Sequence, residues 1–372
     1  MGLPLRILHA VVNMNRGGAE TLIMNLYRNI DRSKVQFDFL TCKEGVFDSE
    51  ILSMGGKIHR IPYVTDVGHA GYVRELNLFF QRNTNYKIVH SHMDKMSGLI
   101  LRAAEKVKIP VRIAHSHSTK SEGGLPSKIY KWYVGNYIKH YANHQYACSN
   151  AAGNWLFTDK FKEIFVLKNG IDLEKFQFSS DVRNQIRNEL QLDEASVVLG
   201  HVGRFSFPKN HLFLLEVFDD LIKFLPNSKL VLVGEGTLKP KIEEKIRNLQ
   251  LEENVILLGV RDDVHLILQA LDLFVFPSLF EGLPVTLIEA QGAGLPCVIS
   301  DSITEEVDMG IGLIQYLSLD NKKIWIESIL NVVNRKSSRI ITENTFNQRG
   351  YNIRKTAELT QDTYIALGGE SC

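Results

Sequence analysis

Residues 273–299 read LFVFPSLFEGLPVTLIEAQGAGLPCVI and contain one complete unit of the expected fold. The apolar run Leu273–Phe276 predicts a buried strand, Val285–Ala290 a helix, and Cys297–Ile299 the next strand. Pro284 suits the first turn of that helix, where a missing N–H costs nothing. A strand, a helix and a second strand in this order form a βαβ unit, in which the two strands run parallel.

The same alternation extends over the whole chain. Apolar runs predict strands at residues 6–12, 37–41, 88–90, 112–115, 145–148 and 164–167, and then at 197–202, 229–233 and 255–258. Amphipathic helices are expected at residues 20–30, 72–81, 99–107, 211–224, 238–249 and 263–268. The pattern predicts the α/β class, with two doubly wound, Rossmann-like domains in series. The turn at 169–178 (NGIDLEKFQF) separates domain 1–172 from domain 173–350. Ligands are expected outside the carboxyl ends of the strands, in a cleft shared by both domains.

Composition excludes several classes of protein. At 372 residues with 44% hydrophobic and 23% charged residues, the chain has a globular composition and no apolar run long enough to span a bilayer. The cysteines are scattered singly, which argues against a zinc site or a disulfide framework and fits the reducing cytoplasm; they are Cys42, Cys148, Cys297 and Cys372. No nucleic-acid-binding motif is present.

Charge is divided unevenly between the two predicted domains. Residues 1–172 contain 23 Lys and Arg against 14 Asp and Glu, a net charge of +9, whereas the remainder contains 20 against 28, a net charge of −8. The two halves are therefore expected to meet different surroundings. Residues 128–140 mix lysines with aromatic residues at helical spacing, which fits either a helix on an anionic membrane surface or an ordinary amphipathic helix packed on the sheet.

Three loops at predicted strand ends carry residues suited to an anionic or sugar ligand. Gly17 and Gly18 follow the first strand and allow close approach of the backbone, although such a turn is also common for structural reasons. Arg204 and Lys209, after the strand 197–202, are either a clamp for a diphosphate or two solvated cations. Glu281 precedes the helix that Pro284 begins.

The third loop is the most specific of the three. Amide groups around Gly282–Val285 would point at an anion. Glu281 and Glu289, eight positions apart, each suit a pair of adjacent hydroxyls on a sugar or ribose. Four histidines also lie at two neighbouring strand ends: His90 and His92, and His115 and His117. Each is either a ligand-binding residue or a neutral structural one.

The segment FEGLPVTLIEAQGAGLP resembles the E-x7-E signature of the retaining, nucleotide-sugar-dependent glycosyltransferases of family four, which have the GT-B fold. The motifs GGAE, VGRF…KN, LVLVGEG, LGVRDDV and NGID extend the resemblance, in the same order, over nearly the whole chain. It is similar, more narrowly, to bacterial exopolysaccharide and capsular-polysaccharide glycosyltransferases. The resemblance also implies that residues from about 351 to 372 form a helix that crosses back onto the first domain.

The resemblance implies a role for each matching residue. Arg204 and Lys209 hold the donor diphosphate, Glu281 contacts the donor sugar, and Glu289 binds the ribose. The loops beneath phosphate, sugar and base comprise Gly17, Gly18, Gly203, Val260, Arg261, Gly282, Leu283, Pro284 and Val285. His115 or His117 belongs to the catalytic site, and His90 and His92 are expected at the acceptor. No metal and no cofactor are expected.

The implied reaction transfers a hexose from a nucleoside diphosphate sugar, expected to be a UDP-sugar, to a hydroxyl of a lipid-linked saccharide acceptor, with retention. The protein is expected in the cytoplasm, with peripheral contact to the inner face of the membrane. Two alternatives stay open: a nucleotide-sugar epimerase or phosphorylase on the same scaffold, and a non-catalytic nucleotide-sugar sensor in a polysaccharide assembly complex.

Overall fold

The computed structural model describes residues 3–121, 123–157, 163–335 and 339–369. The chain divides into two compact units. The first comprises residues 1–170 and 350–372, and the second comprises Ile171–Arg349. The expected C-terminal helix is α16 (Ile353–Gly369), which packs on the first unit; residues 370–372 lie outside the described part of the chain.

The first unit is built on a parallel sheet in the order β3-β2-β1-β4-β5-β6-β7. Its strands are β1 (Leu5–Ala10), β2 (Val35–Thr41), β3 (Ile58–Arg60), β4 (Ile88–Ser91), β5 (Val111–Ser116), β6 (His144–Ala147) and β7 (Phe165–Val166). Most of these strands are continuous buried runs because helices cover both faces of a parallel sheet.

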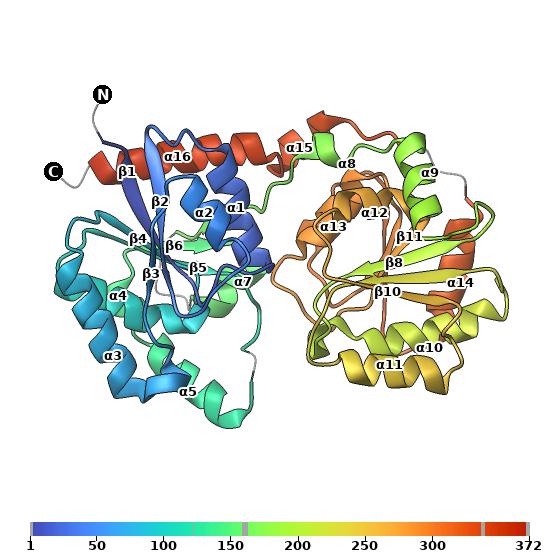
Figure 1. The fold of residues 1–372 in the computed structure, drawn as a ribbon, viewed down its shortest axis with the longest axis horizontal. Coiled ribbons are helices and arrows are strands. Elements are labelled where there is room, and N and C mark those ends of the chain that lie inside the picture. Colours follow the sequence, from blue (N-terminus) through green and yellow to red (C-terminus); the bar gives the residue numbers. More distant parts are fainter. Residues whose placement is uncertain (1–2, 122, 158–162, 336–338, 370–372) are drawn as a thin grey trace. The chain divides into compact units, whose positions relative to one another are not determined.

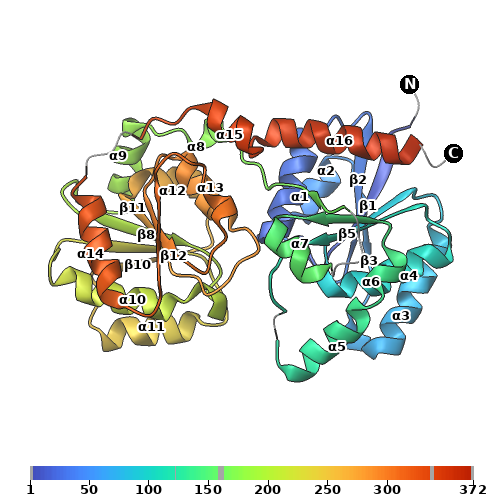
Figure 2. The ribbon, with the colours of Figure 1, turned by 180° about the vertical axis from the view of Figure 1, so that it is seen from behind.

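Helices lie on both faces of this sheet (Figures 1 and 2). One face is covered by α1 (Gly18–Asn29) and α16, which pack on each other and on the strands β1, β2 and β4. The other face is covered by α3 (Val64–Arg82) and α4 (Ser97–Lys106), with α5 (Leu125–Gly135) and α6 (Ile138–Tyr141) beyond. The shorter helices α2 (Asp48–Ser53) and α7 (Asn150–Leu156) complete the unit.

The second unit repeats the architecture with a parallel sheet in the order β10-β9-β8-β11-β12-β13. Its strands are β8 (Val198–Val202), β9 (Lys229–Val233), β10 (Val255–Gly259), β11 (Leu273–Phe276), β12 (Cys297–Ser300) and β13 (Ile314–Leu317). The helices α10 (His211–Ile222), α11 (Lys239–Asn248) and α14 (Lys322–Val333) pack on one face around Phe218 and Trp325. The other face and the connections hold α8 (Leu173–Phe176), α9 (Ser180–Glu189), α12 (Val264–Ala270), α13 (Val285–Gly292) and α15 (Glu343–Arg349).

The structure confirms the predicted α/β class and both parallel sheets. The strand order of each sheet reverses at one place, between β1 and β4 in the first unit and between β8 and β11 in the second. At such a reversal the two connections leave in opposite directions, and ligands of doubly wound sheets bind beside the strand ends there. The loops singled out in the sequence follow these strands.

Candidate functional site

The second unit places Lys209 and Glu281 together at the reversal of its strand order. Lys209 ends the short helix that follows β8, and Glu281 lies in the loop after β11. Lys209 Nζ is 2.7 Å from Glu281 Oε1 and 4.8 Å from the centre of the Phe276 ring. Both charged side chains are only 16% exposed. The ion pair therefore holds a lysine ammonium at a fixed position beside the strand ends.

Hydrogen bonds connect the two loops that carry this pair. Asn210 adopts a left-handed conformation (φ 55°), and its side-chain amide donates to the Pro277 carbonyl at 3.2 Å. The Leu279 amide donates to the Pro208 carbonyl at 2.8 Å. The loop after β8 and the loop after β11 are thus held against each other by hydrogen bonds.

Gly234 lets the loops after β8 and β9 approach each other, and Gly203 leaves space for the Lys209 side chain. Gly234 has φ +139°, and a Cβ on it would lie 2.1 Å from the Gly203 carbonyl oxygen. A Cβ on Gly203 would lie 3.1 Å from Lys209 Cε. A side chain at Gly234 would therefore displace the backbone of the loop that carries Arg204 and Lys209, whereas one at Gly203 would require only a small shift of the Lys209 side chain.

Arg204 differs from Lys209 in its surroundings. It is exposed, and the described residues provide it with no ion-pair partner. A guanidinium at a strand end with unused donors can bind a phosphate with two parallel hydrogen bonds. The two predicted cations thus lie on the same loop, one positioned by Glu281 and one available to an incoming anion.

Helix α13 presents its N-terminus after the buried loop Gly282–Pro284. The expectation that Pro284 lies within the first helical turn is wrong by one position, because Pro284 is the N-cap, with extended backbone (φ −75°, ψ 101°). The ring still stops the helix from starting earlier. The Leu287 amide donates to the Pro284 carbonyl at 3.0 Å, whereas the first two amides of α13, of Val285 and Thr286, precede any intrahelical acceptor and carry the positive dipole end.

Glu289 lies in the second turn of α13 and is largely enclosed. Burial raises the pKa of Glu289 to about 7, because the ionised carboxylate loses its hydration. Near neutral pH this carboxyl group is thus partly protonated, and it can both accept hydrogen bonds from a diol and donate one.

Val260 and Arg261 follow β10. Val260 is 52% exposed and comes after Gly259, which has φ +65°. The Arg261 guanidinium donates to both carboxylate oxygens of Asp263, at 2.8 and 2.6 Å, and to Glu189 at 3.0 Å. These ion pairs occupy the Arg261 side chain. A ligand would therefore contact the backbone of this segment, beside the exposed Val260.

In the first unit, the loop after β1 contains both predicted glycines. Gly17 is the N-cap of α1, and a Cβ on it would lie 2.3 Å from a carboxylate oxygen of Glu20. Gly18 has open space where a side chain would be. The loop therefore brings bare backbone and a helix N-terminus to the strand ends.

The predicted histidines come together on one face of the first sheet, joined by a fifth, His9. Residue His9 on β1 is in register with His90 on β4, and His115 is on the adjacent strand β5. His92 and His117 follow the ends of β4 and β5. Four of the five are buried, and His117 is partly exposed.

Burial keeps these imidazoles neutral at physiological pH. It lowers the pKa of His9 and of His117 to about 3, and lowers the pKa of His90, His92 and His115 well below the usual range. Repulsion between neighbouring rings adds to the effect for His90, His92 and His115. Neutral rings can act as hydrogen-bond donors and acceptors, or as metal ligands.

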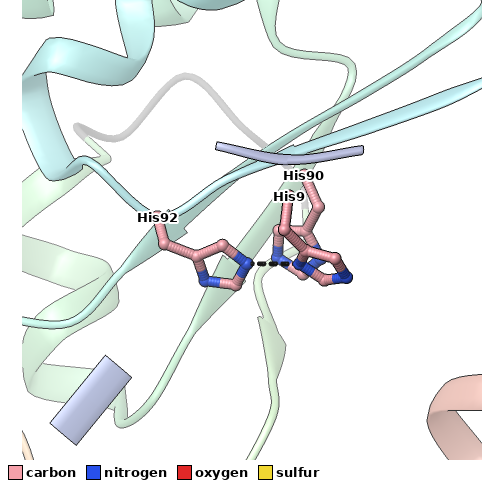
Figure 3. Close-up of side chains that lie close together, drawn as sticks. All are labelled: His9, His90 and His92. Carbon is pink, nitrogen blue, oxygen red and sulfur yellow. Dashed lines mark hydrogen bonds between the residues drawn. The ribbon is translucent and has the colours of Figure 1, made fainter. Parts of the chain in front are cut away.

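Two sets of these rings have ligand nitrogens within 4.8 Å of one another: His9 with His90 and His92, and His92 with His115 and His117. The rings are nearly parallel, at 27° for His9 and His90 and 20° for His90 and His92, and His9 points directly at His92 (Figure 3). Metal ligands need in-plane lone pairs that converge on one point. Stacked rings bonded end to end favour hydrogen bonding over metal binding.

Comparison with known proteins identifies the family. Residues 16–175 match the model of Glycosyltransferase Family 4, and residues 182–309 match the model of Glycosyl transferases group 1. The chain is 38% identical over 368 residues to EpsF of Bacillus subtilis (strain 168), with 96% of each chain covered. EpsF is named as a glycosyltransferase. The chain is a family 4 glycosyltransferase. The resemblance of its sequence motifs to this family is thereby confirmed.

This glycosyltransferase has further relatives with more specific names. It is 31% identical over 307 residues, 77% of each chain, to an Escherichia coli protein named UDP-Gal:alpha-D-GlcNAc-diphosphoundecaprenol alpha-1,3-galactosyltransferase. It is 27% identical over 379 residues to the Staphylococcus aureus capsular polysaccharide biosynthesis glycosyltransferase CapH, covering 97% of this chain and 99% of CapH. The crystal structure of Anabaena HepE with UDP and glucose shares the fold, with a TM-score of 0.75, 18% identity and 98% of each chain covered. The GT-B fold is thus confirmed.

Sequence reasoning missed His9 and Tyr364 in the histidine array. Tyr364 on α16 bonds to His90, with 2.6 Å between its hydroxyl and His90 Nδ1. His9 stands in an apolar run, and only the adjacency of β1 and β4 shows that it faces the other histidines. The only sign of this in the sequence was that His9 is a polar residue within a predicted buried strand.

Proposed function

We propose that this glycosyltransferase moves a hexose from a nucleoside diphosphate sugar to a saccharide hydroxyl, and that the donor is a UDP-sugar. The observation that supports this most is the arrangement at the reversal in the second sheet. Arg204, the Lys209–Glu281 pair and the N-terminus of α13 gather there, with Glu289 behind them. Two cations and a helix dipole suit a diphosphate, and two carboxyl groups suit the hydroxyls of sugar and ribose.

The proposed reaction retains the configuration at the anomeric carbon. The bond from that carbon to the phosphate oxygen breaks through an oxocarbenium-like state, and the acceptor oxygen forms its bond on the same face. The proton of the acceptor hydroxyl passes to the departing phosphate oxygen. Glu281 is held by Lys209 and is not free to attack the sugar as a nucleophile. Stabilisation of the leaving diphosphate by Arg204, Lys209 and α13 takes the place of a metal ion.

The acceptor is proposed to be a lipid-linked saccharide used in exopolysaccharide or capsule synthesis. This rests on the names of the relatives: a diphosphoundecaprenol-linked acceptor for the Escherichia coli enzyme, and capsular polysaccharide for CapH. An epimerase or phosphorylase would use the same phosphate clamp, and a sensor would bind without turnover. The intact set of Arg204, Lys209, Glu281 and Glu289 favours transfer over the sensor.

Release of nucleoside diphosphate from a panel of UDP-, GDP- and ADP-sugars, with membrane lipid extract as acceptor, tests the proposal. One donor is expected to give release, and Glu289→Ala is expected to raise KM for that donor at least about tenfold, because two hydrogen bonds to the ribose are lost. Glu244→Ala, on the exposed face of α11, is the matched control and should behave like the unmodified enzyme. Tight binding without release would support the sensor, and no binding at all would overturn the nucleotide-sugar assignment.

Peripheral contact with the membrane is proposed to occur through α5. Four large apolar side chains lie on one exposed side of this helix, each more than half exposed: Leu125, Ile129, Trp132 and Tyr133. Val134, on the opposite side, is the residue of α5 that is buried against the unit. Lys128 and Lys131 flank the apolar side, and residues 123–141 contain no acidic residue. An aromatic and basic face of this kind fits the interface of an anionic bilayer.

The structure divides residues 128–140 between α5 and the short helix α6, so the expected single helix is replaced by two. Among the described residues, no helix combines the length and apolarity required to cross a membrane.

Trp132→Ser is expected to weaken binding to anionic vesicles at least about tenfold, since it removes the largest apolar side chain of the exposed face. Co-sedimentation with phosphatidylglycerol vesicles at low salt measures this. Phe224→Ser, which replaces an aromatic side chain of the same exposure (63%) in the second unit, is the matched control. Equal binding to zwitterionic vesicles, or no binding of the unmodified protein, would refute membrane contact through α5.

A further inference from the structure

Three of the five histidines form a line of rings bonded end to end. His9 Nδ1 is 2.9 Å from His92 Nε2, and His92 Nδ1 is 2.9 Å from His117 Nε2. Figure 3 shows the first of these bonds, with His92 pointing directly at His9. The line begins inside the sheet on β1 and ends at the partly exposed His117, just beyond the carboxyl end of β5.

A line of neutral imidazoles has only two arrangements of its protons. Each neutral ring carries one N–H and one lone pair. Because both nitrogens of His92 are bonded, this ring must donate at one nitrogen and accept at the other. If His9 donates to His92, then His92 donates to His117; if His117 donates to His92, then His92 donates to His9. The tautomers of all three rings are therefore coupled.

The buried end of the line decides between the two arrangements. His9 Nε2 is enclosed, and no described group bonds to it. In the second arrangement this nitrogen would carry a proton with no acceptor, and buried N–H groups without a partner are rarer than under-used acceptors. In the first arrangement it carries only a lone pair, and its proton is on Nδ1, where it bonds to His92.

We infer that His9 and His92 are positioning residues that hold His117 as the tautomer protonated on Nδ1. His117 Nε2 then accepts from His92, and its Nδ1–H remains as a donor for a substrate oxygen beside the strand ends. The inference rests on the proposed function in giving His117 a substrate, and it separates His117 from His115. His115 is fully buried and is bonded through Nδ1 to His90, at 3.0 Å.

This assignment determines what His117 can do in transfer. Its one lone pair is used by His92, so the ring does not take a proton from the acceptor hydroxyl. It can instead stabilise negative charge on a substrate oxygen through a neutral N–H donor. The departing phosphate therefore stays the proposed base.

The tautomer can be observed directly in the full-length protein labelled with ¹⁵N in its histidine rings. Long-range ¹H–¹⁵N correlation spectra at neutral pH are expected to show His117 protonated on Nδ1, with the signal assigned by its loss in His117→Gln. A His117 ring protonated on Nε2 would overturn the inference. This readout needs no donor and no acceptor, so failure of the proposed function would leave it intact.

Two variants of His92 test its positioning role. His92→Asn places an amide N–H where Nδ1 lies and keeps the donor to His117, whereas His92→Gln places the amide at the position of Nε2 and loses that donor. The expected kcat/KM is roughly tenfold lower for His92→Gln and within about threefold of the unmodified enzyme for His92→Asn. The exposed His140→Asn serves as the control. Equal effects of the Asn and Gln variants, or an unchanged His117 tautomer in His92→Gln, would refute the role of His92.

Discussion

Replacing Arg204 or Lys209 by alanine is expected to lower turnover at least about a hundredfold. The leaving diphosphate gains negative charge in the transition state, and these side chains are the cations of the loop after β8, beside the N-terminus of α13. Removing one preorganised contact to a developing charge typically costs about 2–4 kcal/mol. Lys209→Ala also leaves Glu281, which is only 16% exposed, without its ammonium partner.

Steady-state release of nucleoside diphosphate measures the effect. Lys241→Ala and Arg247→Ala change the same residue types on the exposed face of α11 and should leave turnover unchanged. Lys209→Arg keeps the charge and should recover part of the activity. Unchanged turnover in both alanine variants would exclude these residues from the catalytic site.

The first unit is expected to lose at least about 4 kcal/mol of stability between pH 7 and pH 5. The pKa of His9 and of His117 is about 3 in the folded protein, below the value of about 6.5 expected for the unfolded chain. A lowered pKa means that the contribution to stability is fully present above pH 6.5 and is lost as the pH falls toward 3. Each of the two histidines then costs about 1.4 kcal/mol per pH unit over this window. The pKa values of His90, His92 and His115 are also lowered in the folded protein, so these residues add to the loss of stability at low pH.

Hydrogen exchange of peptides from β1, β4 and β5, followed against urea at pH 7 and pH 5, localises this loss to the first unit. His117→Asn removes one titrating ring and should reduce the pH dependence by about 2 kcal/mol. His140→Asn, at an exposed position of α6, should leave it unchanged. Equal protection of these strands at both pH values would show that the histidines are not held neutral by the fold.

Continuous apolar runs were the most reliable signals in the sequence. Lys229–Val233 and Leu273–Phe276 are strands with the predicted bounds, because a parallel strand covered on both faces must be apolar along its length. The strands β3 and β13 were not predicted. They are edge strands of three and four residues, only partly buried, and such strands lack a continuous apolar run.

The Glu281–Glu289 segment could be predicted from the sequence because its parts are neighbours along the chain. A loop, a proline and a helix fix the N-terminus of α13 through local backbone geometry alone. The family signature has the same local character, so both the fold and the family could be inferred from the residues.

Contacts between distant segments were decided by the tertiary structure. The Lys209–Glu281 pair joins residues 72 positions apart, and it exists because β8 and β11 are neighbours where the strand order reverses. The line from His9 through His92 to His117 depends in the same way on β1, β4 and β5 lying side by side, because His92 and His117 directly follow the ends of β4 and β5. The sequence by itself determined which residues could do the chemistry, because residue type and local backbone are encoded within a few positions. Strand order and register are set by packing over the whole sheet. They decided which of those residues meet, and through those contacts which ring nitrogen of each histidine in the line carries the proton.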